Sequence, residues 1–359
     1  MRLKIVVVSL LCSLLLLSHL SVCVARVAGQ TVPGLVTLSQ PTSRAVYQRD
    51  AANQARIPIV GSYQGVIHSV HARCMMFRDG QWEIGPWTIV STTPANGTFA
   101  TWFSLPAGGW YRIEVHTRAQ GQVVGETAVD KVGVGDVYIT AGQSNSANHG
   151  LPCLKPSDDR IAAMGYSGWQ FAADPQPIAT GSNGTPWPVL GDFLASRMNV
   201  PIGFISVGYG GTSVHQWLPG SSYYQRLRYA LTEAKIYGVR AILWHQGEND
   251  AYSGTTTDQY AQRLQAIINQ SRRDIGWNVP WFIAGVSYGP TFLRERMTAI
   301  RDAQLRVVNN TTVFAGPTTD DLSGPQWRIA DLVHFNEAGM REHARRWANI
   351  LLTTRIPFR

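Results

Sequence analysis

The hydrophobic pattern of this chain of 359 residues changes period once, near Val134. Before this point, short alternating runs are separated by turn residues such as Arg78-Asp-Gly80, a pattern typical of antiparallel strands. After it, strand-like runs alternate with amphipathic helical patterns, which favours a parallel sheet with helices on both faces. The sequence therefore predicts a small β-sandwich of immunoglobulin or fibronectin type at residues 30–134. An α/β domain at 135–359 is predicted to follow it.

The later region is regular enough to predict its elements individually, and its composition, 45% hydrophobic and 15% charged over the whole chain, fits a sizeable core. The strand-like runs cover residues 137–140, 202–207, 241–244, 281–286 and 312–315, and the helical patterns cover residues 187–198, 223–237, 258–274, 292–308 and 337–352.

The first 28 residues have the pattern of a signal peptide. Arg2 and Lys4 precede an apolar run from Ile5 to Leu17, and small residues follow as far as Ala28. This apolar run is too short for a membrane-spanning helix. We therefore expect residues 1–28 to be removed, and a secreted or periplasmic protein with no membrane insertion thereafter.

The net charge of +8 at pH 7 comes almost entirely from scattered arginines. No basic run or stripe is present, so a solvated basic surface is the better interpretation and a nucleic-acid partner is not expected. The sequence does not predict the oligomeric state.

The stretch from Asp136 to Asn145 carries the first chemical signal. A β-branched run ends abruptly in Ala-Gly-Gln-Ser-Asn. A buried strand that stops at a glycine can hold Ser144 at the edge of a sheet, where open α/β folds place their ligands. A serine in such a turn is common, so the hypothesis that Ser144 is a nucleophile depends on the later segments.

Two later segments supply hydrogen-bond donors. Gly211 lies in the Gly-rich turn after the strand at 202–207, and its N–H could join that of Ser144 in an oxyanion hole; a plain turn is the alternative. His245-Gln-Gly-Glu-Asn-Asp250 crowds polar side chains at the end of an apolar strand, which is costly unless they are used or solvated. Either Gln246 or Asn249 is a candidate third donor, and a polar loop is the alternative.

The last segment places Asp331 three residues before His334, ahead of the final predicted helix. An acid and a histidine at this spacing on one turn face the same way, so the carboxylate can orient the imidazole. A single histidine is more often structural, but here the same sheet already offers a serine.

Together the four segments resemble the blocks of the SGNH (GDSL-like) hydrolases, from about Asp136 to Leu352. Gly142-Gln-Ser-Asn145 and His245-Gln-Gly-Glu248 resemble the sialate O-acetylesterase and carbohydrate-acetylesterase branch of that superfamily. The resemblance implies a flavodoxin-like parallel sheet.

The resemblance also implies roles for single residues. Ser144 becomes the nucleophile, His334 the base, Asp331 its orienting acid and Gly211 an oxyanion donor. In this branch the glutamate of the third block also lies beside the histidine, so Glu248 shares the acid role. The chain departs from the branch in having Gly-Glu-Asn-Asp there, as in the wider superfamily, which leaves both Gln246 and Asn249 open as the third donor.

The resulting prediction is a secreted serine esterase that removes O-acetyl groups from sialic acid or from a polysaccharide such as xylan. It needs no cofactor and no metal. Trp217 and its neighbour His215 are the candidates for contact with the sugar. The alternatives are a general lipase or thioesterase of GDSL type, and a carbohydrate-binding protein with a decayed hydrolase site.

Overall fold

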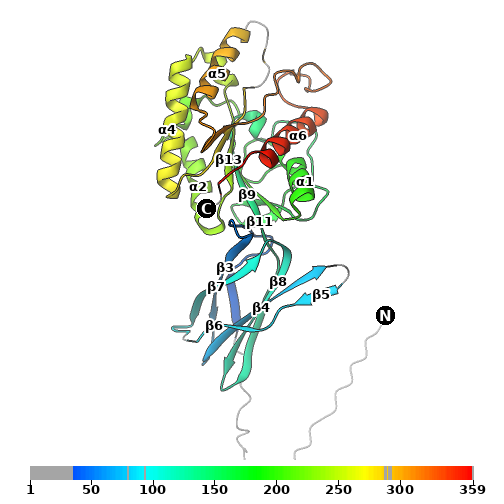
Figure 1. Ribbon diagram of the computed structural model, residues 1–359, viewed down its shortest axis with the longest axis vertical. Helices are drawn as coiled ribbons and strands as arrows, with labels where there is room; N and C mark the ends of the chain where they lie inside the picture. Colours follow the sequence, from blue (N-terminus) through cyan, green and yellow to red (C-terminus); the bar gives the residue numbers. More distant parts are fainter. Residues whose placement is uncertain (1–34, 79–80, 93, 287–288, 290–292, 358–359) are drawn as a thin grey trace, which may run out of the picture. The chain divides into compact units, whose positions relative to one another are not determined.

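The computed structural model describes residues 35–357, apart from residues 79–80, 93, 287–288 and 290–292 (Figure 1). The expected signal peptide at 1–28 lies outside the described residues. The first part of the described chain consists of strands joined by turns. These strands are β1 (Val36–Gln40), β2 (Val46–Gln48), β3 (Gln54–Tyr63), β4 (Ser69–Arg78), β5 (Gln81–Ile84), β6 (Thr88–Ser91), β7 (Thr98–Pro106) and β8 (Gly108–Ala119).

Apart from β2, these strands form two groups. β1, β3 and β7 make a three-stranded antiparallel sheet, whereas β4 pairs with β5, β6 and β8. Alternate residues point inward from both groups: Ile57 and Ile59 of β3, and Ile113 and Val115 of β8, are at most 1% exposed. Because every second side chain is buried, the period of two in the sequence is explained by packing.

β9 (Gln122–Gly142) is a single strand of 21 residues. Its first half pairs antiparallel with β8. Its second half is central to a mostly parallel sheet and pairs with β12 (Ile202–Ser206) and β13 (Ala241–His245). The run of residues from Val132 to Gly142 is buried, because this half has a strand on each side and helices on both faces.

The parallel sheet has the order β11-β10-β12-β9-β13-β14-β15, in which the edge strand β11 is antiparallel to β10. The other strands of this sheet are β10 (Ile161–Gly165), β11 (Gly168–Phe171), β14 (Trp281–Ile283) and β15 (Val313–Ala315).

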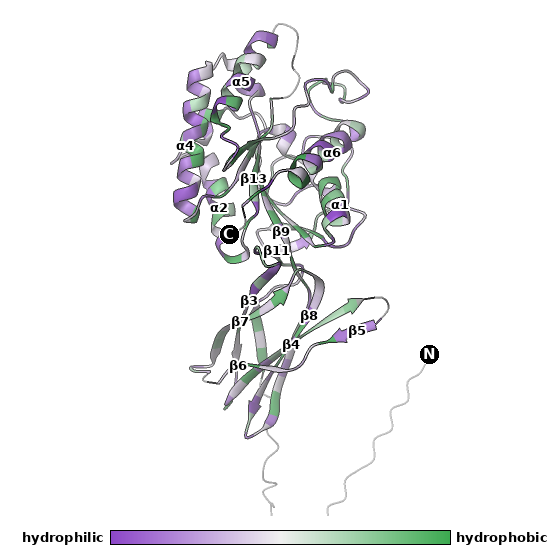
Figure 2. Cartoon of the chain, in the orientation of Figure 1, coloured by the Kyte–Doolittle hydropathy of each residue, from purple (hydrophilic) through white to green (hydrophobic). Residues whose placement is uncertain are grey.

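Helices cover both faces of this sheet (Figure 1). α1 (Trp187–Met198) and α6 (Glu337–Thr353) pack with one buried cluster that includes Tyr138 of β9. α2 (Ser222–Tyr237), α4 (Thr257–Ile275) and α5 (Arg294–Val307) pack with another that includes Ile139. Adjacent residues of β9 thus face opposite cores. Figure 2 shows the hydrophilic residues of α4 interleaved with its hydrophobic ones, as an amphipathic helix requires.

The structure differs from the sequence prediction mainly in short elements. The β10–β11 hairpin, the strand β2 and the helix α3 (Glu248–Ser253) were not expected. Thr256 caps α4, since its side chain accepts from the Gln259 N–H. No helix within the described ranges has both the length and the apolar character needed to span a membrane.

Candidate active site

Ser144 follows the carboxyl end of β9, and the turn that presents it depends on Gly142. Gly142 has φ +128°, and a Cβ there would lie 2.0 Å from the carbonyl oxygen of His245 on β13. Only glycine therefore fits at this end of the strand pair. The Gln143 N–H donates to the same His245 oxygen at 2.9 Å, and residues Ser144–Ser146 then form one 3-10 turn.

Two backbone N–H groups near this turn are free to bind an oxyanion. Within the described ranges, neither the Ser144 N–H nor the Gly211 N–H has a hydrogen-bond acceptor. The segment that carries Gly211 is held against the nucleophile turn, because the Tyr209 N–H donates to the Gly142 oxygen at 2.8 Å. Unpaired, fixed N–H groups of this kind suit the stabilisation of a tetrahedral oxyanion.

The side-chain amide of Gln246 is used entirely in hydrogen bonds within the fold. Its Nε2 donates to Gln143 Oε1 at 3.1 Å, to the Thr212 oxygen at 2.9 Å and to Asp250 Oδ2 at 2.6 Å. Its Oε1 accepts from the Tyr260 hydroxyl at 3.0 Å, and the residue is 0% exposed. An amide whose two hydrogens already serve three acceptors has none to offer an oxyanion.

Asn249 has a donor to spare. Its Nδ2 donates to Ser213 Oγ at 2.6 Å, and that is the one acceptor of this amide among the described residues. The backbone N–H of Asn249 donates to Gln143 Oε1 at 3.3 Å, next to Ser144 in sequence. Of the two candidates for the third oxyanion donor, the geometry therefore favours Asn249 over Gln246.

His334 has a carboxylate partner. Its Nδ1 lies 2.6 Å from Asp331 Oδ2, while Asp331 Oδ1 accepts the backbone N–H groups of Val333 and His334 at 2.8 and 2.9 Å. Burial raises the pKa of Asp331, but these N–H groups and the imidazole lower it more, so its net pKa is below the usual value. An ionised Asp331 can orient the imidazole and stabilise its protonated form.

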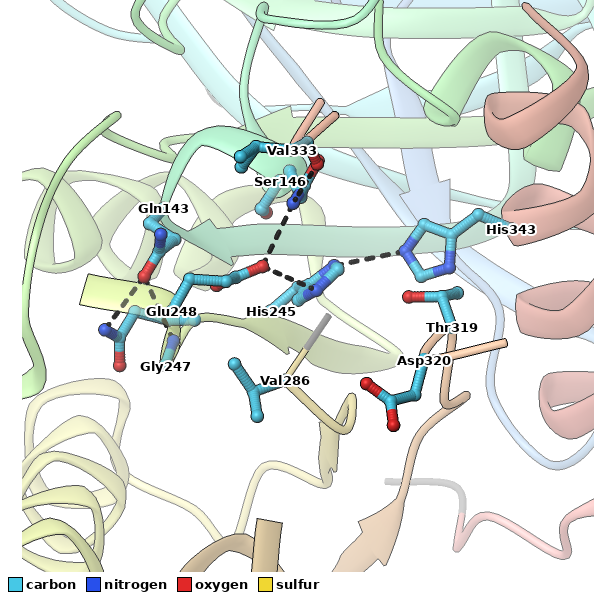
Figure 3. Close-up of polar contacts among 12 residues, drawn as sticks. Gln143, Ser146, His245, Gly247, Glu248, Val286, Thr319, Asp320, Val333 and His343 are labelled. Atoms are coloured by element: carbon cyan, nitrogen blue, oxygen red, sulfur yellow. Dashed lines mark hydrogen bonds and ion pairs between the residues drawn. The ribbon is translucent and has the colours of Figure 1, made fainter. Parts of the chain in front are cut away.

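Glu248 occupies a different position from the one expected. Its Oε1 accepts from Asn145 Nδ2 at 3.0 Å and lies 3.5 Å from His245 Nε2 (Figure 3). Within the described part of the chain it makes no contact of this kind with His334. The expectation that Glu248 shares the acid role beside His334 is therefore not supported by the geometry, because its carboxylate is held by Asn145 and His245.

The Glu248 carboxylate is buried and ionised. Burial alone would raise its pKa. The interactions with His245 and Asn145 have the larger effect and lower the pKa to about 2. His245 in turn lies against His343, with Nδ1 and Nε2 3.2 Å apart, and Figure 3 shows this chain running from Glu248 to His343. Burial, followed by the effect of His245, lowers the pKa of His343.

The nucleophile and base segments are joined by short contacts. Asn145 Nδ2 reaches the Val333 oxygen at 3.5 Å, and the Leu151 N–H donates to the Phe335 oxygen at 3.1 Å. These contacts place the segments of Ser144 and His334 side by side. The described residues contain no hydrogen bond between the two side chains themselves, and such catalytic bonds often tighten only when substrate is bound.

Trp217 does not meet the expectation that it stacks on a sugar. Its side chain is 0% exposed, lies edge-on against Trp244 with centroids 5.4 Å apart, and donates from Nε1 to Thr212 Oγ1 at 2.9 Å. Both its ring and its polar atom are used inside the core. His215, by contrast, is exposed and remains a candidate for substrate contact.

Two site residues were missed from sequence. Gln143 Oε1 accepts from Gln246, from the Gly247 N–H and from the Asn249 N–H, and so joins β9 to the start of α3. His149 stacks on His334, with centroids 5.3 Å and planes 23° apart. The position of Gln143 next to the serine in the Gly-Gln-Ser-Asn motif could have indicated its role. No sequence pattern predicts that His149 stacks on His334.

Among the residues that the structure describes, no group of three or more His, Cys, Asp or Glu side chains could hold a metal ion. What the arrangement can do is activate a serine hydroxyl and stabilise negative charge on a carbonyl oxygen.

Comparison with known proteins gives the class. The family model for "Carbohydrate esterase, sialic acid-specific acetylesterase" matches residues 134–353. A probable carbohydrate esterase of Arabidopsis thaliana is 22% identical over 196 residues, which are 47% of this chain and 74% of that protein.

Two solved structures are similar in fold. A carbohydrate acetylesterase from Xanthomonas citri has a TM-score of 0.58 at 19% identity, over 89% of this chain and 75% of its own. An Arabidopsis thaliana protein has a TM-score of 0.51 at 20% identity, over 61% and 99% respectively.

The chain is thus a carboxylic ester hydrolase of the SGNH superfamily, in its carbohydrate acetylesterase branch. Since the family model spans more than half of its length, the chain belongs to the carbohydrate esterase, sialic acid-specific acetylesterase family.

Proposed function

We propose that the protein is a secreted serine esterase that removes O-acetyl groups from a carbohydrate through an acetyl-enzyme intermediate. The observation that carries this proposal is the Asp331–His334 pair beside a serine whose own N–H is unpaired. The sheet order β12-β9-β13-β14-β15 supports a flavodoxin-like fold, in which ligands bind at the carboxyl ends of the strands.

The first step is acylation. The Ser144 hydroxyl attacks the acetyl carbonyl carbon while His334 Nε2 takes its proton, and the carbonyl oxygen becomes an oxyanion. The N–H groups of Ser144 and Gly211 and the side chain of Asn249 stabilise that oxyanion. His334 then donates its proton to the departing sugar oxygen, which leaves Ser144 acetylated.

The second step repeats this chemistry with water. His334 takes a proton from the water as it attacks the acetyl-enzyme, and Ser144 leaves with that proton as acetate is released. Asp331 remains ionised throughout and stabilises the imidazolium that forms in each step.

The test compares acetate release from acetylated xylan and from O-acetylated sialic acid. Wild type is expected to release acetate from one of them, and Ser144→Ala from neither. Ser146→Ala is the matched control, because Ser146 follows in the same turn and its hydroxyl only donates to the Ala141 oxygen at 3.0 Å. Wild-type rates in Ser144→Ala would overturn the proposal.

Acyl-chain length separates this function from its closest rival. Wild type is assayed on p-nitrophenyl esters from acetate to decanoate. An acetylesterase loses activity as the chain lengthens, whereas a rise in activity with chain length would assign the protein to lipase or thioesterase chemistry.

A further inference from the structure

A polar cluster covers one face of the β4–β8 pair, far along the chain from the catalytic segments. In the antiparallel register His71 lies opposite His116, and Arg73 lies opposite Glu114. Because alternate residues of a strand share a face, these four side chains stand together on the side away from Ala72 and Val115, which belong to the buried core.

Trp87, from the segment before β6, lies on this cluster. Its ring stacks on His116 with centroids 3.8 Å and planes 26° apart, and the Arg73 guanidinium lies 4.6 Å from its ring centroid. The indole is 36% exposed. Beside it is a cavity of about 390 Å³, and Arg112 and Glu126 complete its polar lining.

Both arginines that line this cavity are paired with carboxylates. Arg73 and Arg112 both pair with Glu114, at 2.7 and 2.9 Å, and Arg112 also pairs with Asp130 at 2.9 Å. The carboxylate of Glu126 has no ion-pair or hydrogen-bond partner in the described part of the chain. Neither of the two arginines that line the cavity is therefore left without a carboxylate partner, whereas the Glu126 carboxylate can accept hydrogen bonds from hydroxyl groups.

A buried polar atom is also unsatisfied at this place. His116 is 3% exposed, and its Nε2 has no hydrogen-bond partner among the described residues. Burial, then His71, Arg118 and Arg73, lower its pKa to about 4, so the ring is neutral at physiological pH.

We propose that this cavity is a binding site for a segment of a neutral polysaccharide. The indole offers apolar contact to the C–H groups of a sugar ring, and Glu126 together with the guanidinium edges offers hydrogen bonds to its hydroxyls. The paired arginines and the unpaired Glu126 carboxylate disfavour a negatively charged sugar. The site would hold the polymer independently of the chemistry at Ser144.

Binding is tested on the full chain carrying Ser144→Ala, by calorimetric titration with xylohexaose, cellohexaose and N-acetylneuraminic acid. We expect one of the neutral oligosaccharides to bind, and Trp87→Ala to weaken that binding at least tenfold. Trp102→Ala is the matched control, because Trp102 is 53% exposed and also lies beneath an arginine, Arg56, at 5.1 Å, but on β7.

Glu126→Gln provides a second variant, since Glu126 supports no other side chain and its loss should leave the fold intact. It too should weaken binding. On otherwise wild-type protein, Trp87→Ala should leave hydrolysis of p-nitrophenyl acetate unchanged and slow acetate release from insoluble acetylated xylan. This pair of assays separates failure of the site from failure of the esterase.

Three results would overturn the proposal: no binding of either neutral oligosaccharide, binding of N-acetylneuraminic acid alone, or equal affinity in the Trp87→Ala and Trp102→Ala proteins.

Discussion

Gln246 and Asn249 are amide side chains only three residues apart, yet the structure surrounds them differently. We expect Asn249→Ala to lower kcat about a hundredfold, the usual cost of an oxyanion donor, with little change in Tm. Gln246→Ala should instead lower Tm, because Asp250, Thr212 and Tyr260 lose their buried partner. The measurements are acetate-release kinetics and calorimetry on both variants.

The opposite pattern would reverse the two roles. Suppose that Gln246→Ala had an unchanged Tm but a strongly reduced kcat, and that Asn249→Ala changed neither quantity. The third donor would then be Gln246, and its buried hydrogen bonds would have to rearrange on substrate binding.

Asp331 also allows a test at a single side chain. Asp331→Asn keeps the shape but removes the charge that stabilises the imidazolium, and we expect kcat to fall by about 10⁴-fold. Tm should barely change, since the Asp331 side chain is 42% exposed. Glu337→Gln serves as the control, because Glu337 starts the next helix and pairs only with exposed Arg341. Equal activity of the two variants would remove Asp331 from the mechanism.

At the scale of elements, Glu248 links the start of α3 to β13 and to the nucleophile turn. Its pKa is about 2 in the fold and about 4.3 in an unfolded chain, a difference of about 3 kcal/mol. A lowered pKa means that the unfolded state takes up the proton first as pH falls. This stabilisation is therefore complete above about pH 5 and is lost as pH falls towards 2.

We accordingly expect Glu248→Gln to be less stable than wild type by about 3 kcal/mol at pH 7, with the difference shrinking at lower pH. Urea unfolding of both proteins from pH 7 to pH 3 measures this difference. A gap that stayed constant, or widened, as pH fell would show that the carboxylate is not ionised in the fold.

The elements differ in how well they can be predicted from sequence, for physical reasons. The five longer helices carry an apolar face within their own sequence, so their periods predict them, and α2, α4 and α6 also begin at a capping side chain. α3 has no capping side chain at its N-terminus: Gln143, about a hundred residues earlier, accepts the N–H groups of Gly247 and Asn249. The β10–β11 hairpin is short and wholly dependent on pairing with β12.

The site follows the same division. Ser144 and Gly211 follow the ends of strands, and His334 directly precedes α6; sequence periodicity locates all three positions. The contacts of Gln246, Glu248 and Trp217 are made with residues distant in sequence, so no local sequence pattern predicts their roles. For that reason the roles of Gln246 and Glu248 were open to error, and the Trp217 hypothesis was wrong.

At the scale of the whole molecule, the domain boundary predicted near residue 134 falls inside β9, which the structure shows as one continuous strand. In the structure Gly135 is in close contact with the chain at Pro201, where an added Cβ would lie 1.9 Å from the Pro201 oxygen. The division into domains at 30–134 and 135–359 remains a prediction.

Asp136 tests how tightly the two halves of this strand are coupled. It receives two hydrogen bonds from Arg49, both at 2.9 Å, and one from Gln48 at 3.0 Å, and its side chain is 2% exposed. We expect Asp136→Asn to lower the free energy of unfolding by about 3 kcal/mol, because it breaks a buried ion pair. Calorimetry should show one transition that moves as a whole.

Asp130→Asn is the control, since the Asp130 side chain is 59% exposed and its pair with Arg112 should contribute about 0–1 kcal/mol. Two separate melting transitions, only one of which moves in Asp136→Asn, would show that the halves unfold independently.

The continuity of β9 also limits how this enzyme can be recombined. A cassette exchange that grafts residues 30–134 onto another esterase would cut the strand β9 two residues before Asp136 and shift its hydrogen-bond register. The same cut lies ten residues upstream of the nucleophile. Functional chimeras should therefore carry Gln122–Gly142 as one indivisible unit, with crossovers before Gln122 or beyond the serine turn.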